Sequence, residues 1–395
     1  MNHSPEEEKD GTMNTNSMAL RWVAVATLSA LALSACSSTR DTPATSSAAA
    51  GTDTGTSAAG GTDTGSGTAP SSEAGSSAAG SETGAASGGD VGYSESFLTD
   101  PFQVQLVKQL GDQATAQGVT LLPAVNANAD AAKQSTDVQT LIGRGVKGLI
   151  IVPVDSKAIA PAIKQANAKN IPVVTVDLGA DSGKIAMIVR ADNVYMGKAA
   201  CEYMGKALSG KGQVLNLQGD QATQNGQDRS KGFTDCMTAE FPGITVVSKP
   251  MNWKSEECAT QTQTVVSTSQ IDGIFEGSES VCLTSVQKVL TNQKKDAKVG
   301  EAGHVVTVGI DGSPAGLDAI RAGTMDAIIS QPLDLYAKYG IQYIKEAMAG
   351  KTFTAGPTDH NSNIVKNGDS LEDQLPSPTI TKANVDDKSL WGNGS

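Results

Sequence analysis

The sequence has few aromatic residues, few histidines and no apolar run long enough to span a membrane. Phe, Tyr and Trp make up 4% of the 395 residues, and three histidines occur. The apolar run at residues 22–33 is about twelve residues long, whereas a membrane-spanning helix needs about twenty. The net charge is −12 and no basic patch stands out, so nucleic acid is not an expected partner.

Motifs of the common enzyme classes are also missing. The chain has no G-x-S-x-G elbow, no H-E-x-x-H, no Walker motif and no G-x-G-x-x-G in a strand–helix setting. It has no C-x-x-C and no histidine cluster, which argues against zinc. We therefore expect no enzymatic activity, no cofactor and no metal.

The first 36 residues have the pattern of an export signal. Arg21 precedes the apolar run, which has the length of a signal-peptide core. The run ends in Leu33-Ser34-Ala35-Cys36, which resembles the lipobox of bacterial lipoproteins. This predicts a signal peptide over 1–36 and a lipidated Cys36 that anchors the protein to the outer face of the cell membrane. The alternative is an ordinary secretory signal with an incidental cysteine.

Residues 37–89 cannot form a core, because they contain no aromatic residue and no Leu, Ile or Val. Ser, Thr, Gly and Ala dominate, as in flexible linkers. A flexible chain of this length has an end-to-end distance of roughly 40 Å. The composition predicts a disordered tether between the anchor and a folded head.

From Asp90 onward, strand-like and helix-like segments alternate. The segment 148–154 is a short apolar run typical of a buried parallel strand, and 101–117 has an apolar helical face. Two series of about five strands follow one another, which predicts an α/β fold with two doubly wound, Rossmann-like lobes. In such sheets ligands bind outside the carboxyl ends of the strands.

The strand ends resemble those of the ribose- and galactose-binding branch of type I periplasmic binding proteins, over about residues 90–355. Six motifs occur in the family's order: LTDPFQ at 98–103, TVDLG at 175–179, ADNVYMG at 191–197, DRSKGF at 228–233, VGIDG at 308–312, and Gln331. The resemblance implies three crossings between the lobes, near Ala191-Asp192, Gln331-Pro332 and residues 355–360. It divides the chain into an N-terminal lobe (90–191 and 332–357) and a C-terminal lobe (192–331 and 358–395).

The family's site consists of aromatic walls around a sugar ring, edged by charged and amide groups from both lobes. The resemblance implies the ligand-binding residues Asp100, Phe102, Gln103, Asp177, Arg190, Arg229, Trp253, Ser278, Asp311 and Gln331. Carboxylates accept from sugar hydroxyls, and the arginine fork donates to ring and hydroxyl oxygens.

Three positions depart from the family pattern. Leu178 stands where ribose binders carry arginine, Gln103 where relatives have a second aromatic residue, and Ser278 where they have asparagine. Arg190 is a candidate to supply the missing positive charge. Asp100 and Trp253 are more similar to the glucose- and galactose-type members, which favours a hexose or deoxyhexose.

Each site residue also has a purely structural interpretation. Asp177 and Asp311 are suited to capping turns, and Phe102 and Trp253 to core packing. Arg190 is suited to a solvated surface position. For Arg229 the surface interpretation is weaker, because it lies near a predicted helix N-terminus, where cations are disfavoured.

Apart from Cys36, the cysteines are Cys201, Cys236, Cys258 and Cys282, all in the C-terminal lobe. An even number in an exported domain predicts two disulfides, with buried free thiols as the alternative. Four cysteines allow three pairings. Cys201 and Cys236 lie on helices that flank one strand, which would leave Cys258 to pair with Cys282.

Together these features predict the substrate-binding lipoprotein of an ABC-type sugar importer. It would act as a monomer that closes around a monosaccharide and delivers it to membrane permease subunits. A sensor that presents its ligand to a membrane receptor is the alternative function. A LacI-type repressor needs a basic helix-turn-helix ahead of the lobes, where this chain has a signal and a neutral tether.

Overall fold

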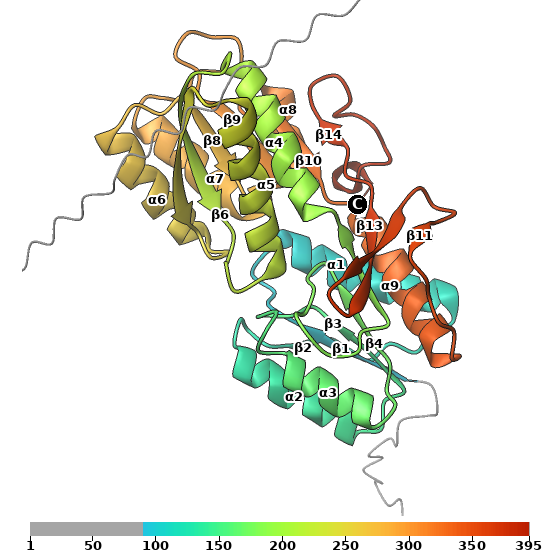
Figure 1. Ribbon diagram of the computed structural model, residues 1–395. Helices are drawn as coiled ribbons and strands as arrows, with labels where there is room; N and C mark the ends of the chain where they lie inside the picture. The colour runs from blue at the N-terminus through green and yellow to red at the C-terminus, as the bar shows by residue number, and fades with distance from the viewer. Residues whose placement is uncertain (1–89, 395) are drawn as a thin grey trace, which may run out of the picture. The chain divides into compact units, whose positions relative to one another are not determined.

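The computed structural model describes residues 90–394, which form two α/β lobes (Figure 1). The first sheet has the strand order β11-β12-β13-β5-β4-β3-β1-β2, and the second has the order β14-β10-β9-β8-β6-β7. The predicted fold class is confirmed. The predicted signal at 1–36, with Cys36, and the tether at 37–89 lie outside the described residues. Among residues 90–394, no helix is both long and apolar enough to cross a membrane.

The first lobe is built on five parallel strands and four helices. The strands are β1 (Val91–Glu95), β2 (Val125–Asn126), β3 (Gly148–Ile151), β4 (Val173–Val176) and β5 (Met187–Ala191), and the helices are α1 (Pro101–Gln117), α2 (Ala131–Gly143), α3 (Ala160–Ala168) and α9 (Leu333–Met348). Strand β5 had not been recognised in the sequence. It carries Arg190 and leads into the first crossing.

Local sequence signals explain why α1 begins and ends where it does. The Asp100 carboxylate accepts from the Phe102 amide at 3.0 Å, and Pro101 occupies the first helical position. Gly118 ends the helix in the left-handed region at φ 68°. These signals fix the helix start at the carboxyl end of β1, where the candidate site lies.

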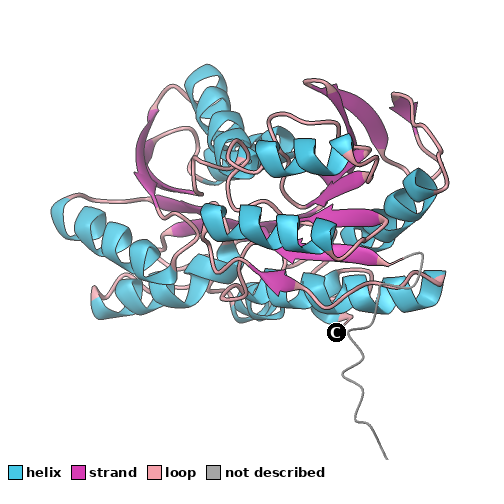
Figure 2. Ribbon diagram, turned by 90° about the horizontal axis from the view of Figure 1, so that it is seen from below, coloured by secondary structure: helices cyan, strands magenta, loops and turns pink. Residues whose placement is uncertain are grey.

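Helices cover both faces of the first sheet, as Figure 2 shows from below. Leu149 and Ile151 pack into one hydrophobic cluster with α2 and α3, whereas Ile150 and Val152 pack into another with α1 and α9. Side chains alternate between the faces of a strand, so a continuous apolar run supplies both clusters.

The second lobe repeats the design. Its strands are β6 (Gly212–Gln218), β7 (Ile244–Pro250), β8 (Gly273–Glu276), β9 (Val306–Asp311), β10 (Ala327–Ser330) and β14 (Thr379–Ile380), and its helices are α4 (Asn193–Ala207), α5 (Gln224–Glu240), α6 (Ser255–Thr268), α7 (Glu279–Asn292) and α8 (Pro314–Ala322). A short 3-10 helix, Trp391–Asn393, follows near the end of the described chain.

Two of the three crossings lie where the resemblance implied. The chain passes from β5 to α4 at Asp192, and from β10 to α9 at Gln331-Pro332. The third lies at residues 376–378, between β13 and β14, and not near 355–360.

The difference arises from a β-hairpin that the sequence pattern does not predict. Strands β11 (Gly356–Pro357), β12 (Asn363–Asn367) and β13 (Ser370–Leu375) extend the first sheet, with β13 parallel to β5. A two-residue turn with Gly368 at φ 57° joins β12 to β13. Residues 363–375 therefore belong to the first sheet, although 358–395 had been assigned to the C-terminal lobe.

Both disulfides lie in the second lobe and join consecutive helices. Cys201 of α4 bonds to Cys236 of α5, and Cys258 of α6 bonds to Cys282 of α7. This is the pairing that the order of the helices favoured. Neither bridge spans the two lobes, so neither restricts their relative motion directly.

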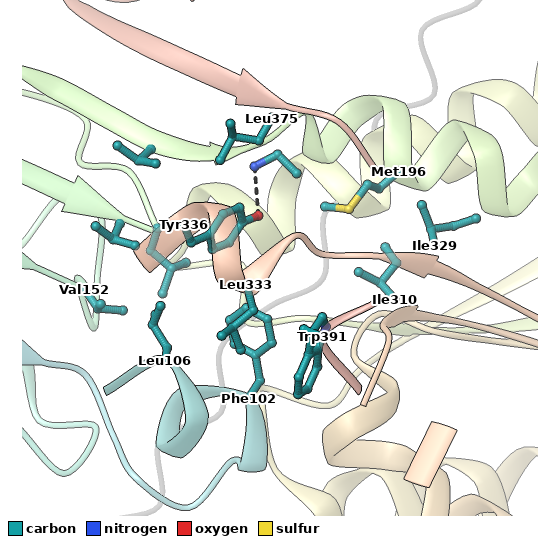
Figure 3. Close-up of a cluster of buried hydrophobic side chains, with 14 of the residues drawn as sticks. Phe102, Leu106, Val152, Met196, Ile310, Ile329, Leu333, Tyr336, Leu375 and Trp391 are labelled. Atoms are coloured by element: carbon teal, nitrogen blue, oxygen red, sulfur yellow. Dashed lines mark hydrogen bonds between the residues drawn. The ribbon is translucent and has the colours of Figure 1, made fainter. Parts of the chain in front are cut away.

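One hydrophobic cluster is shared by both lobes (Figure 3). Phe102 of α1 makes edge-on contacts with Tyr336 of α9, at 6.1 Å between ring centroids, and with Trp391, at 5.7 Å. The Tyr336 hydroxyl accepts from the Ala191 amide at 2.8 Å, beside the first crossing. The C-terminal segment, for which the sequence indicated no site role, thus packs directly behind the candidate site.

Glycines allow α4 and α5 to pack with their backbones in close contact. A methyl group on Gly232 would lie 2.0 Å from the Val194 carbonyl oxygen, whereas one on Gly111 of α1 would meet no atom within 4 Å. We expect Gly232→Ala to lower the free energy of unfolding by about 1–3 kcal/mol through overpacking. Gly111→Ala should raise it by roughly 0.5–1 kcal/mol through helix propensity. Urea unfolding of both variants checks this, and equal stabilities would contradict it.

Candidate functional site

Nine of the ten predicted ligand-binding residues converge on one small cavity between the carboxyl ends of the two sheets. Its volume is about 20 Å³, which is room for one or two water molecules. The predicted ligand residues that line it are Asp100, Phe102, Gln103, Asp177, Arg229, Trp253, Ser278, Asp311 and Gln331. Phe97 and Leu178 complete the lining.

Asp177 follows β4 in the left-handed region, at φ 64°. Its carboxylate accepts from Gln103 Nε2 at 2.7 Å and from Asn225 Nδ2 at 3.2 Å, so it receives donors from both lobes. Burial raises the pKa of Asp177 to about 6, and the nearby Arg229 guanidinium opposes this increase. At neutral pH Asp177 is therefore a carboxylate, able to accept from a ligand hydroxyl.

Asp311, the last residue of β9, is the most heavily hydrogen-bonded carboxylate of the cavity. Its side chain accepts from Ser278 Oγ at 2.6 Å, from Ser280 Oγ at 2.6 Å and from Gln331 Nε2 at 2.6 Å. Its carbonyl oxygen accepts from Trp391 Nε1 at 2.9 Å. Asp311 has a positive φ of 140°, which L-residues rarely adopt, and these contacts hold it there.

Arg229 provides the positive charge of the cavity and is 3% exposed. Its Nε donates to Asn193 Oδ1 at 2.7 Å, and Nη1 donates to the Gly277 carbonyl oxygen at 2.7 Å. Nη1 also lies 3.8 Å from Asp311 Oδ1, and the guanidinium carbon lies 5.5 Å from the centre of the Trp253 ring. These contacts fix the orientation of the guanidinium, which leaves further donors for an oxygen-rich ligand.

Aromatic residues supply the apolar parts of the wall. Phe102 is almost fully buried and serves both the cavity and the core cluster, so the two interpretations of this residue are compatible. Trp253 and Phe97 are half-buried. Phe97 gives the site an aromatic side chain near Gln103, where the sequence lacks the family's second aromatic residue.

Two buried polar atoms of the lining residues have no hydrogen-bond partner in the protein: Gln103 Oε1 and Trp253 Nε1. Buried polar groups are nearly always paired, so unpaired ones in a cavity are suited to a polar ligand. Here one acceptor and one donor are available, in addition to the carboxylates. Among residues 90–394, no group of three or more His, Cys, Asp or Glu side chains is arranged to hold a metal ion.

A hydrogen-bonded bridge connects the lobes at the edge of the cavity. Ser280 Oγ lies 2.9 Å from Asp100 Oδ1 of the first lobe and 2.6 Å from Asp311 Oδ2 of the second. Burial and the charge of Asp311 raise the pKa of Asp100 to about 7. Ser280 was not among the predicted site residues, although it lies two positions beyond Ser278 at the start of α7.

Arg190 does not line the cavity, in contrast to its expected role. Its Nε donates to Glu372 Oε2 at 2.9 Å, Nη1 donates to Asn225 Oδ1 at 2.9 Å, and Nη2 donates to Asp228 Oδ2 at 2.9 Å. The partner Glu372 lies on β13, a strand that the sequence pattern does not predict, so this pairing is visible only in the structure. The Arg190 charge is neutralised within this network.

Comparisons with known proteins agree with the fold. The periplasmic binding protein domain family matches residues 91–352. The ribose import binding protein of Escherichia coli strain K12 is 30% identical over 261 residues, which cover 66% of this chain and 85% of that protein. The xylitol-binding protein of Mycolicibacterium smegmatis is 29% identical over 264 residues, which cover 66% of this chain and 68% of that protein.

Comparisons with solved structures also agree with the two-lobed fold. An ABC transporter solute binding protein from Mycobacterium smegmatis with bound glycerol has a TM-score of 0.66 and 26% identity, covering 76% of this chain and 96% of its own. The Caulobacter myo-inositol binding protein has a TM-score of 0.68 and shares the fold at 23% identity, covering 78% of this chain and 98% of its own. With two α/β lobes, a polar cavity between them and a family match over most of the described residues, the chain belongs to the periplasmic binding proteins, in the type I branch that includes the ribose import binding proteins.

Proposed function

We propose that the protein captures a monosaccharide between its lobes and delivers it to the permease of an ABC importer. The observation that carries this proposal is the lining of the cavity, in which Asp177, Asp311 and Arg229 meet the aromatic rings of Phe102 and Trp253. A sugar offers hydroxyls that donate and accept, together with patches of C–H. Charge-assisted hydrogen bonds suit the hydroxyls and aromatic faces suit the C–H patches.

For the ligand we propose a six-carbon sugar, a hexose or deoxyhexose. Asp100 and Trp253 resemble their counterparts in glucose- and galactose-type members, and Leu178 stands where ribose binders carry an arginine. Relatives that are 28–30% identical include ribose import binding proteins, so D-ribose is the decisive competitor.

The mechanism we propose is an equilibrium between open and closed lobes. In this structure hydrogen bonds connect the lobes, at Asp100–Ser280 and at Asp177–Asn225. A ligand that contacts both lobes favours the closed state by its differential affinity for that state. The crossings at Asp192 and at Gln331-Pro332 are the positions where the chain can bend.

We further propose that the head is a monomer, anchored to the membrane through Cys36 and separated from it by residues 37–89. The support is the signal-like run at 22–33 with the lipobox-like Leu33-Ser34-Ala35-Cys36, followed by a segment without core-forming residues. An anchored head on such a tether would remain within reach of a membrane permease.

A thermal-shift panel of monosaccharides tests the proposal. It should contain D-glucose, D-galactose, L-fucose, D-allose, D-ribose and myo-inositol, with titration calorimetry for those that shift the transition. A bound sugar at 100 to 1,000 times its Kd should stabilise the protein by about 2.7–4.1 kcal/mol. Binding of D-ribose alone would contradict the hexose assignment. A panel without any stabilising sugar would contradict the sugar-binding function.

A further inference from the structure

A second, larger cavity opens directly outside the small one. Its volume is about 960 Å³, and residues of both lobes line it. Phe97, Asp100 and Trp253 line both cavities, so the two adjoin at these side chains. Ligand pockets for small molecules usually measure about 300–1,000 Å³, so the outer cavity has the size of a binding site in its own right.

The outer cavity has the chemistry that a carbohydrate requires. Exposed polar side chains, such as Asn252 and Thr284, offer amide and hydroxyl groups. The outer cavity is lined by charges of both signs, from Asp220, Lys254 and Glu256. This cavity therefore does not select for an ion of one sign. Apolar Pro101, Val154 and Val281 provide surface for the C–H faces of a ring.

The shared wall is built into the fold. Trp253 has φ 56°, in the left-handed region, and its ring lies over Gly219 at the end of β6. A methyl group on Gly219 would lie 2.0 Å from Trp253 Cη2, so only glycine allows the indole to occupy this position. The indole also contacts Arg229 of the inner cavity, at 5.5 Å from the guanidinium carbon to the ring centre. One aromatic residue is thereby available to ligand groups on both sides.

We infer that the sugar bound in the inner cavity carries a substituent that lies in the outer one. The full ligand would then be a disaccharide or another glycoside, with one ring held by Asp177, Arg229 and Asp311 and the extension held between Phe97, Trp253 and Thr284. This inference rests on the proposed function and specifies the substrate class of the same site. A free monosaccharide would leave the outer cavity empty, and the inner cavity of about 20 Å³ must widen by separation of the lobes to take a ring.

Paired probes test this inference on the whole folded head. D-galactose is compared with melibiose and lactose, and D-glucose with cellobiose, maltose and trehalose, by titration calorimetry. We expect at least one disaccharide to bind ten or more times tighter than the monosaccharide it contains. Thr284→Trp should occupy part of the outer cavity and remove that gain, while the Kd of the monosaccharide changes by less than twofold, because Thr284 does not line the inner cavity.

The matched control is Thr260→Trp, which places the same side chain on an exposed position of α6 that lines neither cavity. It should leave both affinities unchanged. If a monosaccharide binds and every disaccharide binds more weakly, the inference is wrong and the proposed function stands. If Thr284→Trp weakens both kinds of probe equally, or neither, the outer subsite is also disproved. If no probe of either kind binds, both proposals fail.

Discussion

Replacing Arg229 with glutamine is expected to weaken sugar binding by at least about thirtyfold and by up to a few thousandfold. Removing one member of a buried, hydrogen-bonded charge pair costs about 2–5 kcal/mol in binding. Arg229 is 3% exposed and lies 3.8 Å from Asp311, so its loss leaves the carboxylates of Asp311 and Asp177 without a cation in the cavity. Titration calorimetry with the tightest sugar of the panel measures the effect.

Arg321→Gln is the matched control for this experiment. Arg321 lies in the same lobe, on α8, but its ion pairs with Asp318 and Asp386 are at the surface. Surface ion pairs contribute little, so the Kd should change by less than twofold. Circular dichroism should show both variants folded. An Arg229→Gln protein that is folded and binds the sugar as tightly as the wild type would refute the assigned role of Arg229.

The second prediction concerns Asp100, whose replacement by asparagine should stabilise the protein at pH 8. The geometry of the Ser280 bridge gives the reason. A serine hydroxyl has one proton, yet Ser280 Oγ is within hydrogen-bond distance of carboxylate oxygens of both Asp100 and Asp311. Both contacts are hydrogen bonds only when one of the two carboxyl groups is protonated. Burial raises the pKa of Asp100, so Asp100 is the group that we expect to carry the proton.

The raised pKa of Asp100 determines how the stability of the folded protein changes with pH. The pKa of Asp100 is raised from about 3.9 in an unfolded chain to about 7 in the folded protein. The stabilising contribution of this raised pKa is fully present below about pH 4 and is lost as the pH rises through about 7. The pKa of Asp177 is raised to about 6, so this residue changes the stability with pH in the same direction. Its contribution is the same in the wild type and in Asp100→Asn, because both proteins contain it.

Urea unfolding between pH 4 and pH 8 measures the difference. At pH 8 we expect Asp100→Asn to be more stable than the wild type by roughly 1–3 kcal/mol, and its stability to fall less steeply with rising pH. Asparagine also caps helices, so the start of α1 should be preserved. Asp112→Asn, at an exposed position of α1, is the control and should follow the wild type. Parallel curves for the wild type and Asp100→Asn would contradict the protonated bridge.

The extent to which the sequence predicted this protein differs between its parts. The long periodic segment 101–117 is a helix as predicted, because its apolar face and its caps are local signals. Residues at strand ends could be placed in one site because parallel strands of a sheet end at one edge. Asp177, which directly follows β4, and Asp311, the last residue of β9, illustrate this, since both strands are buried.

Long-range pairing could not be read from the chain. Strand β13 pairs with β5, almost 200 residues earlier, and its partly polar sequence gives no sign of the partner. Because β13 was not predicted, the third crossing was expected too early in the chain. For the same reason Glu372 was not expected as the partner of Arg190. Phe97 and Ser280 were missed for a different reason. Phe97 lies in a loop that carries no periodic pattern, and Ser280 contacts Asp100 only where the two lobes meet.

The small inner volume has a kinetic consequence. A space of about 20 Å³ between contacting lobes cannot admit a sugar from solution, so entry must wait until the lobes separate. The observed rate of association should then level off at high sugar concentration, at a value set by the opening step. Release is subject to the same limit, so a permease that pulls the lobes apart would control when the cargo leaves.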